Sequence, residues 1–140
     1  MNLFSFLESS AEKYPDKTAL VCEEKRSTYS QLKNRSERLA SSLYELGIRK
    51  GMKAGILLHN STEYVEIVFA LMKLGAVGVP LNIRLTKAEI KEQASHSDVS
   101  ILFYESGLKV KAPFDVLSIN HFVITCPGSC KKGTQQLTVR

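Results

Sequence analysis

The amino-acid sequence predicts an α/β fold: a partial doubly wound parallel sheet with flanking helices, preceded by a small N-terminal hairpin. Strand-like and helical segments alternate from residue 53 to residue 104, which is typical of βαβ units. Capping and stop signals separate these segments. The length of 140 residues, with 44% hydrophobic and 24% charged residues, is that of an ordinary globular domain.

The N-terminal segment is predicted to form a helix and then a hairpin. Asn2 can cap the helix, and the sequence around Pro15 ends it. Its apolar residues recur at helical spacing: Leu3, Phe6, Leu7 and Ala11. Residues 18–22 are then predicted to form a strand, and residues 26–29 its hairpin partner.

A second helix is predicted from Ser30, as its cap, to residue 46, with Gly47 as the stop. Its apolar stripe is expected to pack on a sheet and consists of Leu32, Leu39, Leu43 and Leu46. Residues 53–58 are almost continuously apolar, as expected for a strand buried on both faces.

The next helix is predicted to begin with a capping-box variant of Asn60 and Glu63 and to end at Gly75. Residues 76–81 form the following predicted strand, which Pro80 terminates because proline cannot donate to a ladder.

The last predicted helix opens with a capping box of Thr86 and Glu89 and runs to about His96. Two residues lie on its inner side: Ile90 and Ala94. Residues 100–104 form the next strand, and short strands are then expected at 116–119 and 122–124.

Charge and composition argue against several classes of protein. The net charge is +5, but three of the 19 basic residues fall in 121–140, which holds no acidic residue. Charges of both signs are mixed along the predicted helices, so no nucleic-acid partner is expected. The most apolar window, 64–83, contains Glu66 and Lys73, so no transmembrane segment is expected.

The three cysteines and the N-terminus point to a cytoplasmic protein. An odd number of cysteines without the density of a disulfide framework fits a reducing compartment. The first ten residues have neither a basic n-region nor an unbroken apolar h-region, so they do not form a secretory signal.

Three segments together carry a family resemblance: Tyr-Pro-Asp-Lys-Thr-Ala-Leu at 14–20, Ser-Thr-Tyr-Ser-Gln-Leu at 27–32, and Leu-Met-Lys-Leu-Gly-Ala-Val-Gly-Val-Pro-Leu-Asn at 71–82. Each has a structural explanation, since Gly75 allows a helix to stop and Gly78 allows close backbone approach. In this order and spacing, they resemble the opening of the AMP-forming acyl-CoA synthetase, or adenylate-forming, ligases.

This resemblance implies a reaction in two steps. ATP and a carboxylate give an acyl-adenylate and pyrophosphate, and the thiol of coenzyme A then displaces AMP. ATP with Mg²⁺ and coenzyme A are therefore implied for the full-length family, where a phosphate loop and a mobile lysine lie further along the chain. The resemblance identifies residues 1–120 as the N-terminal part of an adenylating domain of a fatty-acyl or aryl-CoA ligase. We expect it to be inactive alone and to bind no cofactor tightly.

Residues 121–140 form an atypical basic tail that resembles a degenerate phosphate loop. The family loop is roughly Thr-Ser-Gly-Thr-Thr-Gly-x-Pro-Lys-Gly. The matching positions here are Thr125, Gly128, Ser129, Lys132 and Gly133. The run is one residue short, and Cys130 replaces a hydroxyl residue or glycine. Three interpretations stay open: a degraded loop, unrelated or frame-shifted sequence, and a functional variant.

No catalytic residue and no metal site are predicted. Cys126 and Cys130 lack a second ligand pair apart from the isolated His121, whereas structural zinc needs four ligands. His59 follows a predicted strand at the end where ligands bind in open parallel sheets, but we interpret it as a loop or capping residue. His96 ends a helix and needs no further function.

A second hypothesis is a non-catalytic interaction module, or a truncated or frame-shifted product. Parallel sheets need covered faces and edges, so an open edge would favour self-association or pairing with a complementing chain.

Overall fold

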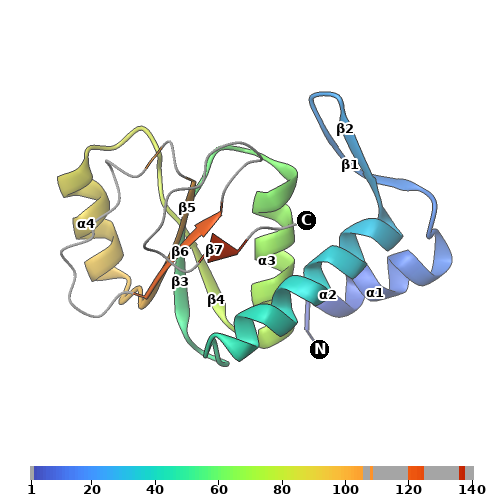
Figure 1. The fold of residues 1–140 in the computed structure, drawn as a ribbon, viewed down its shortest axis with the longest axis horizontal. Coiled ribbons are helices and arrows are strands. Elements are labelled where there is room, and N and C mark those ends of the chain that lie inside the picture. Colours follow the sequence, from blue (N-terminus) through green and yellow to red (C-terminus); the bar gives the residue numbers. More distant parts are fainter. Residues whose placement is uncertain (1, 106–107, 109–119, 125–135, 138–140) are drawn as a thin grey trace. The chain divides into compact units, whose positions relative to one another are not determined.

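The computed structural model describes residues 2–105, 108, 120–124 and 136–137. It confirms the α/β class, with helices, a parallel sheet and an antiparallel hairpin (Figure 1). The chain forms two compact units. Unit 1 comprises Met1–Gly51 and Asn60–Val77, and unit 2 comprises Met52–His59 and Gly78–Arg140.

Unit 1 holds three helices and the hairpin: α1 (Phe4–Lys13), β1 (Thr18–Cys22), β2 (Lys25–Thr28), α2 (Tyr29–Glu45) and α3 (Thr62–Leu74). Helix α3 packs against α2, and α1 contacts both. The core of α1 differs from the prediction. Phe4, Leu7 and Ala11 are buried, whereas Leu3 and Phe6 are 59% and 58% exposed. The helix starts at Phe4, so the i, i+3, i+7 stripe begins there and leaves Phe6 on another face.

The cap of helix α2 lies two residues earlier than predicted. Thr28 is the cap: the Gln31 N–H donates to Thr28 Oγ1 at 3.2 Å, and the Thr28 N–H donates to Gln31 Oε1 at 2.9 Å. Ser30 is therefore inside the helix. Ser61, not Asn60, caps α3 by accepting a hydrogen bond from the Tyr64 N–H at 3.2 Å.

The stop signals are confirmed. Gly47 follows the last residues of α2 with φ of 98°, and Gly75 ends α3 with φ of 69°. Both values lie in the left-handed region that glycine adopts without a steric penalty. Pro80 ends β4 as predicted.

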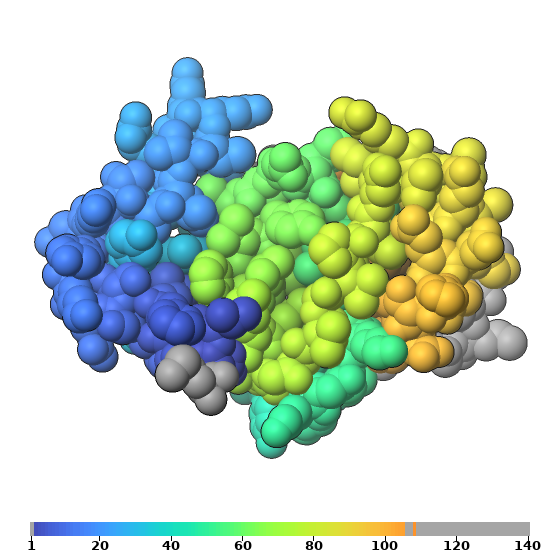
Figure 2. Space-filling model, turned by 180° about the vertical axis from the view of Figure 1, so that it is seen from behind, coloured from blue at the N-terminus to red at the C-terminus, as the bar shows by residue number. Residues whose placement is uncertain are grey.

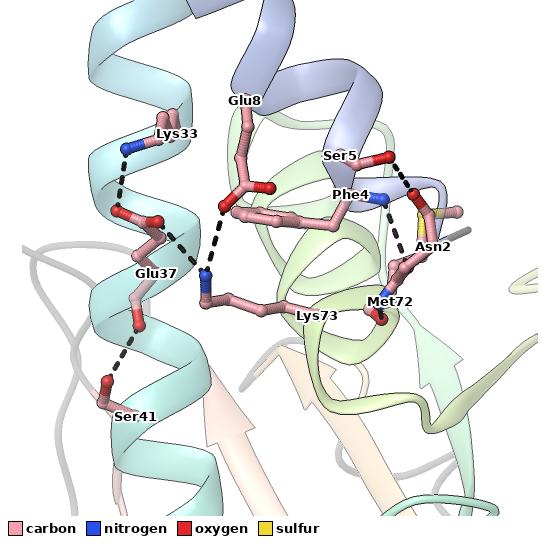
Figure 3. A network of polar contacts seen from close by, with 9 residues as sticks. All are labelled: Asn2, Phe4, Ser5, Glu8, Lys33, Glu37, Ser41, Met72 and Lys73. Carbon is pink, nitrogen blue, oxygen red and sulfur yellow. Dashed lines mark hydrogen bonds and ion pairs between the residues drawn. The ribbon is translucent and has the colours of Figure 1, made fainter.

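One lysine of α3 links the three helices of unit 1 (Figure 3). Lys73 Nζ lies 3.1 Å from Glu37 Oε1 on α2, 3.6 Å from Glu8 Oε1 on α1 and 4.4 Å from the ring centre of Phe4. Lys33 Nζ lies 3.3 Å from the other oxygen of Glu37. Burial alone would raise the pKa of Glu37, but the hydrogen bonds and charges of Lys73 and Lys33 outweigh it and lower that pKa. The ionised form of Glu37 is thus favoured in the folded protein.

Unit 2 is built on a sheet with the strand order β4-β3-β5-β6-β7. Its elements are β3 (Lys53–Leu57), β4 (Val77–Pro80), which starts at the unit boundary, α4 (Lys87–His96), β5 (Ile101–Glu105), β6 (Asn120–Ile124) and β7 (Gln136–Leu137). Strands β3, β5, β6 and β7 pair in parallel. The strand predicted at 122–124 lies within β6, and the one at 116–119 lies outside the described residues.

The core of unit 2 lies under α4, where Ile90 and Ala94 are fully buried as predicted. The capping box of Thr86 and Glu89 is also confirmed, with the Thr86 N–H donating to Glu89 Oε2 at 2.8 Å. The other buried members of this core are Leu57, Leu81, Val99, Leu102, Tyr104 and Leu108. None of the helices in the described ranges is long and apolar enough to cross a bilayer.

The cap of α2 gives a test of its starting residue. Thr28→Ala should lower the free energy of unfolding by about 1 kcal/mol, because it removes the acceptor of the Gln31 N–H. Ser30→Ala is the matched control and should change it by less than about 0.5 kcal/mol. Urea unfolding followed by circular dichroism measures both, and a larger loss in the Ser30 variant would contradict the assignment.

Gly55 in β3 gives a test of core packing. A Cβ there would lie 3.0 Å from Leu102 Cδ1 and 3.1 Å from both Leu81 Cδ1 and Val99 Cγ1. Gly55→Ala should therefore destabilise the protein by about 1–3 kcal/mol, measured by thermal or denaturant unfolding. Adding Val99→Ala should recover part of the loss, since it removes one crowded methyl group. Strictly additive effects of the two substitutions would show that this crowding is absent.

Candidate functional site

The strand order of unit 2 marks one position in the sheet as a place for ligands. Strands β4 and β5 follow each other in the sequence but lie on opposite sides of β3. The connection from β4 to β5 therefore passes β3, and the order of the strands reverses there. In open α/β sheets, ligands bind outside the carboxyl ends of the strands at such a switch point.

Two polar side chains meet at the carboxyl ends of β3 and β5. The parallel register pairs Leu57 with Tyr104, so the residues that follow emerge at the same edge. His59 lies two residues beyond Leu57, and Glu105 is the last residue of β5. Nδ1 of His59 contacts Oε1 of Glu105, and the side chains are 58% and 22% exposed.

This pair changes the interpretation of His59. The sequence placed His59 correctly at the end of a strand but supplied no carboxylate partner for it. Glu105 is 46 residues away and becomes a neighbour only through the β3–β5 register. The available signal was that His59 and Glu105 each directly follow a predicted strand, 53–58 and 100–104.

The chemistry open to this pair is limited. An imidazole next to a carboxylate can hold a proton and orient a polar group of a ligand. Two side chains are too few to enclose a metal ion, and the described residues hold no cluster of three or more His, Cys, Asp or Glu that could do so. The pair alone does not make a complete catalytic array.

The predicted phosphate-loop residues lie outside the described part of the chain. They are Thr125, Gly128, Ser129, Lys132 and Gly133. The strand that precedes them is described: β6 ends at Ile124, whose parallel partner is Glu105. β6 thus ends next to Glu105, one residue before Thr125. The next described strand is β7, where Leu137 pairs with Ile124.

Some of the other candidate residues lie in the described part of the chain, and some lie outside it. His96 is the last residue of α4, as predicted. Cys126 and Cys130 lie outside the described residues, so the structure does not test their exclusion as metal ligands. Cys22 is a free, partly buried thiol.

Comparison with known proteins agrees with this architecture. The family model for AMP-binding enzymes matches residues 7–134. A medium/long-chain-fatty-acid–CoA and 3-oxocholest-4-en-26-oate–CoA ligase of Mycobacterium marinum is 32% identical over 105 residues, which cover 75% of this chain and 19% of that ligase. This chain therefore spans about a fifth of the length of the curated relatives it matches.

Two solved structures extend the comparison to three dimensions. The fatty acyl CoA synthetase of Mycobacterium tuberculosis has a TM-score of 0.79 at 28% identity, covering 89% of this chain and 26% of that one. The o-succinylbenzoate coenzyme A synthetase of Bacillus subtilis, in complex with AMP, has a TM-score of 0.77 at 30% identity, covering 85% and 31%. The motifs at 14–20, 27–32 and 71–82 and the match over residues 7–134 agree: this chain belongs to the AMP-binding enzyme family.

Proposed function

We propose that these 140 residues are the N-terminal part of an ATP-dependent, AMP-forming ligase that joins a fatty or aryl carboxylic acid to coenzyme A through an acyl-adenylate. The observation that carries this proposal is the family match over residues 7–134. The relatives include ligases for fatty acids and for 2-succinylbenzoate, an aryl acid. The sheet and helices serve here as the scaffold for a larger site.

The described residues at the carboxyl edge do not by themselves fit ATP. Adenylation needs cationic or amide groups that clamp the triphosphate while the carboxylate attacks the α-phosphate. The polar pair at this edge is His59 and Glu105, and a carboxylate repels phosphate. ATP with Mg²⁺ and coenzyme A therefore belong to the longer ligase, and we propose no adenylation by these 140 residues alone.

Acyl-dependent exchange between ATP and labelled pyrophosphate tests the absence of activity. The purified 140-residue protein should show no exchange above a protein-free blank with either fatty or aryl acids. A related full-length ligase is the positive control. Clear exchange would overturn the inactivity while leaving the family membership intact.

We also propose that the tail carries a weak phosphate contact centred on Lys132, with the other loop positions Thr125, Gly128, Ser129 and Gly133. Support comes from the resemblance of this run and from its place after the carboxyl end of β6, where ligands bind in open parallel sheets. Missing glycines limit the geometry in which backbone amides could face a phosphate. Binding should accordingly be weak.

Titration with ATP tests this contact. We expect a dissociation constant of about 1 mM or weaker for the unmodified chain, a free energy of about 4 kcal/mol. Lys132→Ala should abolish the binding, and Lys131→Ala is the control for the register of the loop. Equal binding of ATP by Lys132→Ala and by the unmodified chain would exclude the phosphate-loop assignment. The family membership would be unaffected.

The alternative function is a non-catalytic module that pairs with a complementing chain. Strand β4 ends the strand order of the sheet, so no further described strand pairs on its other side. An unpaired edge favours association. Co-elution with a chain that carries the downstream motifs would favour this alternative.

The free thiol of Cys22 is compatible with the cytoplasm, where we place the protein.

A further inference from the structure

A buried carboxyl group in unit 1 has no part in the function proposed above. Glu66 lies on α3 and is only 1% exposed. Its Oε1 is 2.8 Å from Nε of Arg35 on α2, while its Oε2 has no hydrogen-bond partner among the described residues. Oγ of Ser36, also on α2, is buried and unpartnered as well. A carboxylate buried with one unsatisfied oxygen is costly to keep ionised.

The charged neighbours of Glu66 come from three elements. Arg35 faces it from α2, Glu63 from its own helix, and Lys25 from β2. Nζ of Lys25 is 3.8 Å from Glu63 Oε1, and its side chain is 68% exposed, so water screens its charge. Burial, assisted by the charge of Glu63 and opposed by Arg35 and Lys25, raises the pKa of Glu66 to about 7.

The remaining elements packed against α3 direct their polar groups elsewhere. Glu8 of α1 pairs with Lys73. Cys22 of β1 contacts the carbonyl oxygen of Asn60, just before α3 begins. Arg35 is thus the single cation in direct contact with Glu66 among the described residues, and its own side chain is 34% exposed.

We propose that the Arg35–Glu66 contact is a proton-operated joint, in which α2 and α3 stay closely packed while Glu66 carries a proton and separate more readily once it ionises. The neutral acid costs less to keep buried than the ionised acid does. The ionised acid gains from solvent, and it reaches solvent by opening the helix pair. The joint is a property of unit 1 and does not depend on the proposed ligase function.

The direction of the pH effect follows from proton binding. The packed state holds the proton of Glu66 up to a pH of about 7, whereas an exposed glutamate releases it near 4.5. The packed state therefore binds more protons between these values, and the ratio of packed to open protein falls by up to about tenfold per pH unit. Below about 4.5 and above about 7, this contribution no longer changes.

Hydrogen exchange of the full 140-residue chain tests the joint. Protection factors of amides in α2 and α3, corrected for intrinsic exchange, should fall by about 70-fold between pH about 5 and about 8, for those amides that exchange through this opening. Glu66→Gln keeps the shape of the side chain without the titration, so its protection should be flat over this range. Glu12→Gln, at an exposed position of α1, is the matched control and should retain the slope of the unmodified protein.

The substitution Arg35→Gln distinguishes two explanations of the Arg35–Glu66 contact: a proton-operated joint and a purely structural contact. Because Arg35 favours the ionised form of Glu66, its loss should extend the falling range of protection to higher pH. Carbon-13 NMR of the Glu66 carboxyl group in the unmodified chain gives a direct readout even if a variant does not fold. A titration midpoint near 4.5 would overturn the proposal, and so would a midpoint near 7 without any loss of protection in α2 and α3.

Discussion

The parallel register between β3 and β5 is the constraint on which the rest of unit 2 depends. It pairs Ala54 with Ile101 and Leu57 with Tyr104, all of them buried. Strands buried in this way must be apolar on both faces, and both segments are. A shift by one residue would carry the side chains of one strand to the opposite face. The same register brings His59 and Glu105 together and sets the position of β6, so the core and the candidate site share one cause.

Much of the fold could be predicted because its signals are local. Gly75, Pro80 and the Thr86–Glu89 box act through conformations that depend on a few neighbouring residues, and all three were correct. The starts of α2 and α3 were each wrong by one or two residues. Thr28 and Ser61 both have extended backbones, which lets their side chains reach the first free amides, whereas Ser30 is already helical. Several hydroxyl and amide residues compete there, and the path of the preceding chain decides between them.

The site could be predicted only in part, because its contacts are not local. His59 was recognisable from its position after a buried strand, but Glu105 becomes its partner only in the folded sheet. Glu66 entered the sequence analysis merely as a charge that argues against a membrane span. Its burial against Arg35 depends on how two helices pack, and helical spacing alone does not reveal that. The candidate phosphate-loop positions in the tail follow from a sequence motif, and their contact with phosphate is a proposal.

The division of the chain into two units has a consequence for its synthesis. Residues 52–59, which include β3, belong to unit 2 but lie between the two segments of unit 1. Unit 1 has all its helices once residue 77 has left the ribosome, while β3 must wait for α4 before Leu57 is covered and for β5 before its second edge is paired. Since chains emerge at about 5–20 residues per second, this strand stays unshielded for seconds. During those seconds the nascent chain exposes the apolar side chains of β3 in a segment that lies between the two parts of unit 1.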